Sequence, residues 1–589
     1  MVARRGDGLG AHGVVQVGGL GAGDLLRSAS TPVLAIDPRD PHRILLGNRI
    51  ERPRFGCSVF TSADGGKKWT ASSFALPPIG DRCYAPSVVY DADGTGFLLL
   101  TMLKGRGNEP FGAFLYRSRD GGLHFERPMH VLPPFSFQSS VAAAHRLLVV
   151  VSLAGTEFSR HATFGLGPPP NPVVVRISRD GGRSFSSPRA ISAPGELLVG
   201  GPALAIGARG EIDVLYWDYG DDVFDYYSFP GRYGGRFRLV LAVSRDGGRT
   251  FRRHVVEPAV VPAQPFLAYL PPLPALAVDP RTDALFAAWE DGRSGSGDVL
   301  FRRSLDGGTS WSPPRLLFSG PPDDRTPELA VDDAGRLVAI AYRIADRGRT
   351  ETAVRVSRDG GATFSEPAAL TPSAFDARIA PRVPNHGDEI DLGSRLGLTV
   401  GRHATLAGWA DTRAGNPDTG KVDVLVARVP GGLPRPSALP TAAPAPPPVP
   451  SRADRRLRGA CTHGPPVDSR RSPVAVVRSF VSALDADDLL RAYGYLDPRW
   501  RGGHAPVRIP HPFASFAAGY HTLTCARLAG AELYDRSEDG RWATFRIWFA
   551  ARRGGGPTRL GIGIVWTHSD TARAPWSVMG FWTRELAAR

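Results

Sequence analysis

The stretch "RSLDGGTSW", Arg303 to Trp311, holds a serine, an aspartate two positions later, a glycine pair and an aromatic residue. Asp-Gly between alternating apolar runs predicts a β-hairpin, because the carboxylate can cap backbone N–H groups and glycine accepts a positive φ. The serine can bond further turn groups, and the aromatic ring can pack back between neighbouring sheets. Taken alone, the stretch predicts a turn.

The same pattern occurs six times, with serines spaced 53 to 66 residues apart. Self-similarity at a period of this length predicts a repeat architecture. In each copy the serine, the aspartate and the aromatic residue are the structural positions, and the six sets are Ser62, Asp64, Trp69; Ser118, Asp120, Phe125; Ser178, Asp180, Phe185; Ser244, Asp246, Phe251; Ser304, Asp306, Trp311; and Ser357, Asp359, Phe364.

Each turn belongs to a larger unit of four short strands, as in "PALAVDP", "ALFAAWED", "DVLFRR" and "WSPPRLL" around the fifth copy. Four antiparallel strands per repeat predict a propeller blade. Units begin near Pro32, Pro86, Ser139, Gly201, Pro274 and Pro327, and a seventh, 395–429, has three strands. The spare strand in "HGVVQVGG", 12–19, can complete that seventh sheet and remove its exposed edge. The prediction is a mostly β chain with seven blades, or six if two units merge.

Composition narrows the functional classes to which the chain can belong. The chain has 589 residues, 69 Gly, 54 Pro and a net charge of +14, but only four lysines among its 71 basic residues. The arginines are scattered without a basic run, which favours a solvated surface over a nucleic-acid partner. No apolar run of about 18 residues exists, so we expect no transmembrane segment. We expect no metal and no cofactor. No secretory signal is visible in "MVARRGDGLGAHG".

Four cysteines form two groups that are local in sequence, Cys57 with Cys83 and Cys461 with Cys525. An even count without a CxxC pair favours two disulfides over a metal site. Disulfides would place the chain in an oxidising compartment, outside the cell or at its surface. The alternative is four unrelated buried thiols.

A Pro- and Ala-rich segment, 431–471, predicts an extended linker between a propeller at 12–430 and a second domain at 472–589. The second domain starts with a serine cap and Pro473 at the first helical position. The apolar residues of the helix fall on one face: Val474, Val477, Phe480, Val481 and Leu484. Four strand-like stretches follow. The order resembles the small α+β cone-like fold of the nuclear-transport-factor and ketosteroid-isomerase superfamily, here as an accessory domain.

The S-x-D-x-G-x-x-[WF] turn resembles the Asp box, or bacterial neuraminidase repeat, of sialidase-like β-propellers. "AWEDGRSGSGDV" (288–299), "GWADTRAGNPDTGKVDV" (408–424) and "HGDEIDLGSRLGL" (386–398) are similar to further elements of that family. The resemblance implies that the Asp boxes are structural. It also implies that the active or binding site lies on the opposite face, where the second-to-third loops and the crossings between blades emerge.

Arginines and aromatic residues on that face are candidates for ligand binding, including part of a long insert at Tyr216–Gly235 that is either a sugar-binding loop or a self-packed one. The candidates are Arg49, Arg82, Trp217, Tyr219, Tyr226, Trp289, Arg293, Arg325, Trp409 and Arg413. In the W-x-D-x-R elements, the aspartate can instead cap its loop and pair with the arginine. Weak catalytic candidates are Asp218, Asp291, Asp324 and Asp411.

A retaining sialidase needs three arginines, an aspartate and a tyrosine nucleophile. The F/Y-R-I-P stretch of the family is absent before the first Asp box, and no tyrosine lies between Arg343 and Pro430. We therefore expect recognition of a glycan or another surface ligand without sialidase catalysis. The alternatives are an exo-glycosidase of exo-α-sialidase-like type that uses carboxylates in the central well, and a scaffold for a protein partner.

Overall fold

The computed structural model describes two units, divided between Pro447 and Pro448. The described residues are 14–17, 28–52, 56–78, 82–104, 109–156, 170–196, 198–220, 237–261, 263, 273–319, 323–345, 348–381, 391–402, 404–415, 420–429, 467–498, 501, 513–520, 522–536, 541–553, 559–570 and 575–585. The predicted linker at 431–471 lies largely outside this set.

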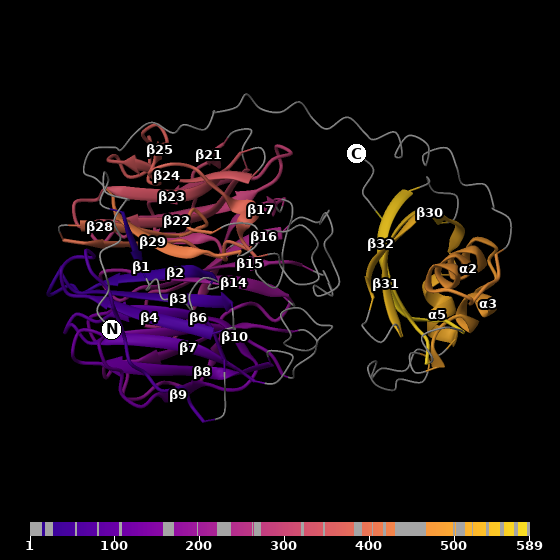
Figure 1. Cartoon of the computed structure of the whole chain (residues 1–589), viewed down its shortest axis with the longest axis horizontal. Helices are drawn as coiled ribbons and strands as arrows, with labels where there is room; N and C mark the ends of the chain where they lie inside the picture. The colour runs from indigo at the N-terminus through magenta and orange to yellow at the C-terminus, as the bar shows by residue number, and fades with distance from the viewer. Residues whose placement is uncertain are drawn as a thin grey trace. The chain divides into compact units, whose positions relative to one another are not determined.

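The first unit is a seven-bladed β-propeller, as predicted, and Figure 1 shows its strands. The first four sheets each hold four antiparallel strands in chain order. Blade 1 is β2 Ser28–Ile36, β3 Ile44–Arg52, β4 Gly56–Ser62 and β5 Thr70–Ala71; blade 2 is β6 Arg82–Tyr90, β7 Gly96–Lys104, β8 Glu109–Ser118 and β9 Met129–Leu132; blade 3 is β10 Ser136–Ala144, β11 Leu147–Ala154, β12 Val173–Ser178 and β13 Arg189–Ala190; blade 4 is β14 Val199–Ile206, β15 Ile212–Asp218, β16 Phe237–Ser244 and β17 Arg252–Val260.

Three more blades follow, and the last one takes a strand from the start of the chain. Blade 5 is β18 Ala275–Val278, β19 Leu285–Asp291, β20 Asp298–Ser304 and β21 Arg315–Phe318; blade 6 is β22 Asp323–Val331, β23 Leu337–Ile344, β24 Arg349–Ser357, β25 Ala368–Ala369 and β26 Phe375–Asp376; blade 7 is β27 Gly397–Gly401, β28 Ala404–Asp411, β29 Asp423–Arg428 and β1 Val15–Val17.

The ring closes through β1, which pairs antiparallel with β29 in the register Val15 to Val426 and Val17 to Val424. In Figure 1 the indigo β1 lies beside the orange β29. The first strands of successive blades also contact one another around a full circle, from β2 through β27 and back to β2. These seven strands therefore form the inner wall of the propeller. The apolar cores lie between neighbouring sheets, as in the cluster shared by blades 5 and 6.

The six serine–aspartate turns join third to fourth strands and share one geometry. In the turn at Ser304, the serine hydroxyl donates to Asp306 Oδ1 at 2.7 Å and accepts from the Gly308 N–H at 2.8 Å. Both glycines have a positive φ, and a Cβ on Gly308 would lie 2.5 Å from Leu241. The same two bonds recur at Ser62, Ser118, Ser178, Ser244 and Ser357. The serine and the aspartate are thus occupied within the turn.

Arginines join these turns to the preceding blade. Arg245 donates to the Gly307 carbonyl at 2.6 Å, and Arg303 donates to the Gly360 carbonyl at 2.8 Å. Arg117 and Arg428 bond Gly181 and Gly65 in the same way. Part of the arginine excess therefore connects neighbouring blades, which agrees with a scattered rather than clustered charge.

Each blade has two ends that differ in their connections. The turns between first and second strands and between third and fourth strands lie at one end, which we call the hairpin face. The second-to-third loops and the crossings between blades lie at the other end, which we call the crossing face.

The second unit holds three described helices and one antiparallel sheet. The helices are α2 Pro473–Asp485, α3 Leu489–Gly494 and α5 Phe513–Tyr520, and the strands are β30 Leu523–Arg536, β31 Trp542–Arg553, β32 Arg559–His568 and β33 Ser577–Glu585. As predicted, Ser472 caps α2, and its hydroxyl accepts from the Ala475 N–H at 3.2 Å. Val477, Phe480 and Leu484 are buried against the sheet. The resemblance to the cone-like superfamily stays a prediction. No described helix is long and apolar enough to cross a membrane.

Candidate functional site

A repeated bulge on the inner strands shapes the crossing face. The pairing of first and second strands shifts register between Ser30 and Val33, and the same shift occurs in blades 2, 3, 4 and 6. Thr31, Gln138 and Thr326 have positive φ at this point, which is uncommon for residues other than glycine. A proline follows the bulge in several blades, where its missing N–H does no harm. In blades 1, 2, 3, 4 and 6 the first strand therefore begins two to four residues before the predicted start of the unit, whereas in blade 5 it begins at Ala275, directly after Pro274.

Six side chains from blades 1, 2, 6 and 7 gather around this part of the inner wall. We call them the central cluster: Arg49, Glu51, Tyr84, Glu328, Asp391 and Arg395. Arg49 is 1% exposed and pairs with Glu51 and, at 3.0 Å, with Asp391. Its guanidinium also lies 5.3 Å from the centre of the Tyr84 ring. Two residues far apart in the sequence, Arg49 and Asp391, are thus joined by an ion pair where blades 1 and 7 meet.

Glu328 and Arg395 complete the cluster from blades 6 and 7. Burial raises the pKa of Glu328 to about 7, although Arg395 acts in the opposite direction. Burial lowers the pKa of Arg395, and Glu328 and Tyr84 oppose that change. Burial also raises the pKa of Glu51. The cluster therefore combines two arginines with three carboxyl groups, of which Glu328 exchanges its proton near neutral pH.

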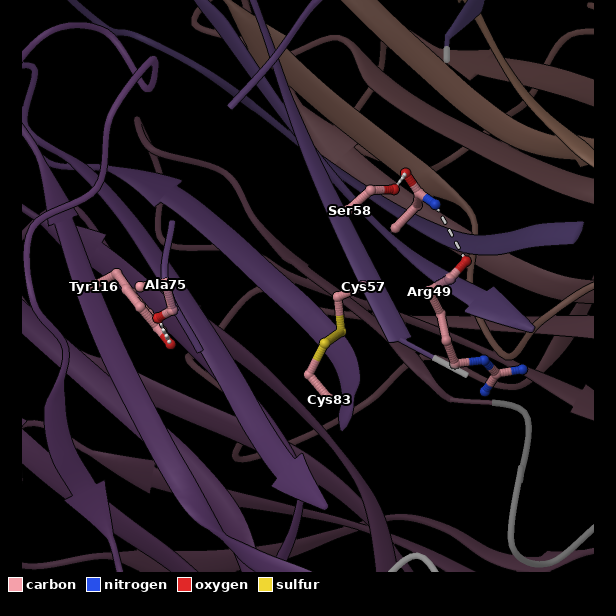
Figure 2. Close-up of a disulfide and its surroundings, with 7 residues drawn as sticks. Arg49, Cys57, Ser58, Ala75, Cys83 and Tyr116 are labelled. Carbon is pink, nitrogen blue, oxygen red and sulfur yellow. Dashed lines mark hydrogen bonds between the residues drawn. A yellow bond between two sulfur atoms is a disulfide. The ribbon is translucent and has the colours of Figure 1, made fainter. Parts of the chain in front are cut away.

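The Cys57–Cys83 disulfide is present and lies beside the cluster (Figure 2). It joins β4 of blade 1 to β6 of blade 2 with the two Cα atoms 5.8 Å apart. Cys57 pairs with Arg49 across β3 and β4, and Cys83 directly precedes Tyr84. The disulfide therefore ties β4, which pairs with the strand that carries Arg49, to the strand that carries Tyr84. Cys525 is disulfide-bonded, and its predicted partner Cys461 lies outside the described residues.

The four weak catalytic candidates are buried and paired with arginines. Asp291 accepts from Arg293 at 2.8 and 2.7 Å, and Asp411 accepts from Arg413 at 2.9 and 2.7 Å. Asp218 pairs with Arg238. Asp324 pairs with Arg343 at 3.1 Å, and burial raises its pKa to about 7. Their exposed fractions are at most 1%, so none offers a free carboxylate to a ligand.

In both W-x-D-x-R elements the aspartate caps its own loop and pairs with the arginine, which is the structural alternative to a ligand-binding role. The Trp289 ring N–H donates to Asp291 at 3.3 Å, and the Trp409 ring N–H donates to Asp411 at 3.0 Å. Backbone N–H groups of Arg293 and Arg413 donate to the same carboxylates. Each aspartate is thus fully engaged by its own loop.

The predicted aromatic platform is not open in the described residues. Trp217, Tyr219, Trp289 and Trp409 are at most 2% exposed, and Tyr219 packs edge-on against Phe237. Tyr226 and the rest of the insert from 221 to 235 lie outside the described residues.

Of the predicted arginines, only Arg49 belongs to the central cluster. Arg325 pairs with Asp323 at 3.3 Å and with Glu290 at 3.6 Å, at the junction of blades 5 and 6. Arg82 is partly exposed on β6. Sequence reasoning missed Glu51, Tyr84, Glu328, Asp391 and Arg395. For Tyr84, Glu328, Asp391 and Arg395 the available signal was their position in or just before inner strands, next to Cys83, Pro327 and in the "DLGSR" stretch. Glu51 lies at the end of β3, two positions after Arg49.

Comparison with known proteins gives no family: no family model and no curated protein matches the chain. Solved structures give matches at the level of sialidase-like propellers. They include a Dyadobacter fermentans protein of unknown function (14% identity, 71% of this chain, 98% of that chain, TM-score 0.40). A Hadza microbial sialidase matches with 14% identity over 65% of this chain and 73% of that chain, with a TM-score of 0.39. The alpha-L-arabinanase of Penicillium chrysogenum matches with 15% identity over 59% of this chain and 94% of that chain, with a TM-score of 0.37. Similarity this distant says nothing about ligand or activity.

Proposed function

We propose that this chain is a glycan-recognition propeller that binds its ligand at the central cluster on the crossing face. The observation that carries the proposal is the convergence of Arg49, Tyr84, Glu328 and Arg395 from four blades on one part of the inner wall. Arg49 and Tyr84 are buried and support the cluster from behind, whereas Glu328, Asp391 and Arg395 are half-buried. The arginine and carboxyl groups of these half-buried residues can donate to and accept from sugar hydroxyls.

Recognition without sialidase catalysis fits the rest of the crossing face. The four aspartates that were candidates for hydrolysis form ion pairs with arginines, as Asp291 does with Arg293. A single disulfide in the described residues supports an extracytoplasmic place of action. We propose that the second unit is an accessory domain at 472–589, which the linker at 431–471 joins to the propeller.

The experiment is a glycan array combined with a hydrolysis screen on the same purified chain. We expect binding to one class of glycans and no release of sugar from any of them. Hydrolysis of sialosides would contradict the absence of sialidase chemistry. No binding to any glycan would favour a scaffold for protein partners.

A glycoside hydrolase is the second candidate, and Glu328 is the observation that favours it. A carboxyl group with a pKa near 7 can hold a proton for a leaving group at neutral pH. If the chain hydrolyses a glycoside, the rate should depend on the protonation of one group near pH 7, and Glu328→Gln should abolish it. These two results together would favour a hydrolase over recognition alone.

A further inference from the structure

A groove between blades 3 and 4 on the hairpin face is separate from the central cluster. It has a volume of about 490 Å³. Val175 and Ile177 of β12 form its floor, and Arg179, Arg189 and Arg249 lie around it. A cavity of this size accommodates a small ligand of about two sugar rings. We call it the blade 3–4 groove.

The groove carries excess positive charge. Its one acidic lining residue, Asp180, already accepts several hydrogen bonds within its own turn. Asp180 accepts from the hydroxyls of Ser178 and Ser184 at 2.7 and 2.5 Å and from the backbone N–H of Ser184 at 3.0 Å. These hydrogen bonds lower the pKa of Asp180, which stays ionised. Three guanidinium groups therefore face one carboxylate that has little capacity left for them.

The matching junction between blades 5 and 6 shows what is different here. Arg315 occupies the place of Arg189: it pairs with Phe301, as Arg189 pairs with Val175. Arg315 donates to the Ala362 carbonyl of the next turn and lies 5.3 and 5.5 Å from the rings of Phe301 and Phe364. Its guanidinium thereby fills the junction between the two blades.

In blades 3 and 4 the side chains at both positions differ, although the turn keeps its backbone carbonyl. Val175 replaces the phenylalanine ring, and Arg249 stands where Ala362 stands in the next turn, so a second cation lines the groove together with Arg189. Arg249 donates to the Asp246 carbonyl at 3.2 Å, and Arg179 donates to the Gly247 carbonyl. Within the described part of the chain, Arg189 is exposed and no bond to its guanidinium is recorded. Among the described residues, the junction therefore stays open and the Arg189 guanidinium is available as a donor.

We propose that the blade 3–4 groove binds a saccharide that carries an oxyanion, either a sulfate or a carboxylate, with Arg189 and Arg249 as the charged donors. Guanidinium groups form paired hydrogen bonds with such oxyanions. The C–H face of a sugar ring can cover Val175 and Ile177. The exposed Ser187 hydroxyl is a further donor at the rim.

The test is calorimetric titration of the full chain with four probes: a sulfated disaccharide, an unsulfated uronate disaccharide, a neutral disaccharide and inorganic sulfate. We expect one of the two charged disaccharides to bind and the neutral one not to bind. Arg189→Ala and Arg249→Ala should each weaken binding by about tenfold, because each removes a charge-assisted donor. Which charged disaccharide binds decides between sulfate and carboxylate.

Arg127→Ala is the matched control, since Arg127 is exposed at the same turn position of blade 2 as Ser187 in blade 3. It should leave binding unchanged. The proposal is overturned if neither charged disaccharide binds, if inorganic sulfate binds as well as the saccharide, or if Arg127→Ala weakens binding as much as Arg189→Ala. Saccharide binding that is lost in Glu328→Gln but kept in Arg189→Ala would place the ligand at the central cluster and overturn this proposal alone, so failure here and failure of the proposed function are distinguishable.

Discussion

At the residue scale, buried charge is the main feature of this propeller. Arg49 is 1% exposed and makes ion pairs with Glu51 and Asp391. These two carboxylates outweigh the effect of burial and raise the pKa of Arg49. Removing one partner of a buried pair leaves an uncompensated charge, which costs more than the pair itself contributes.

We therefore expect Arg49→Met to lower the free energy of unfolding by about 3–5 kcal/mol. The measurement is urea denaturation at neutral pH. Arg127→Ala, an exposed arginine, should change it by no more than about 0.5 kcal/mol. A loss for Arg49→Met as small as that of the control would mean that the central cluster does not hold blades 1 and 7 together.

Asp213 on β15 gives a second prediction, for pH dependence. Its side chain is 0% exposed, its carboxylate oxygens have no hydrogen-bond partner among the described residues, and burial raises its pKa from 3.8 to about 7. Between these two values, the folded state keeps a proton that the unfolded chain has released. Stability should therefore fall as the pH rises through this window.

Asp213→Asn removes this titration. We expect the variant to be more stable than the wild type at pH 8 by about 4 kcal/mol, and the advantage to shrink as the pH falls and to disappear near pH 4. Charged neighbours are Arg245, Glu211 and Asp283, and they are unchanged. Parallel stability curves for the two proteins from pH 5 to 8 would show that Asp213 is not the group responsible.

At the element scale, the serine–aspartate turn repeats one set of bonds and brings its glycines close to the next sheet. Hydrogen bonds from Ser310 and Ser304 lower the pKa of Asp306 to about 2, so the turn stays charged and closed. We expect Ser304→Ala to reduce the free energy of unfolding by about 1–2 kcal/mol, because the Gly308 N–H loses its buried acceptor.

Thermal or urea unfolding measures this change, with Ser373→Ala as the control because Ser373 is exposed. Ligand binding at the crossing face should be the same in Ser304→Ala as in the wild type. A Ser304→Ala variant with altered ligand binding but wild-type stability would contradict a structural role of the turn.

The sequence predicted these elements better than it predicted the site. Hairpin turns depend on residues within nine positions, so "RSLDGGTSW" and its five relatives were sufficient to predict the blades. The central cluster depends on Arg49 meeting Asp391, 342 positions away. It also depends on bulges at Thr31 and Thr326, and neither residue type signals a positive φ. The W-x-D-x-R loops were visible in the sequence, but their burial was not.

At the scale of the whole molecule, the propeller is closed by three residues, Val15–Val17. Removal of residues 1–17 leaves the edge of β29 unpaired. We expect this truncation to lower the melting temperature by several degrees and to promote aggregation, because exposed strand edges pair with other chains. Removal of residues 1–13 is the control and should change neither. Equal melting temperatures for both truncations would contradict closure by β1.

Ligand binding at the central cluster can be measured through the affinity of Glu328→Gln for the strongest glycan-array ligand. The exchange keeps the shape of the side chain and removes its ability to ionise next to Arg395. We expect Glu328→Gln to bind this ligand at least about tenfold more weakly than the wild type, and Ser304→Ala to bind it equally well. Affinities of Glu328→Gln and wild type that agree within error would contradict it.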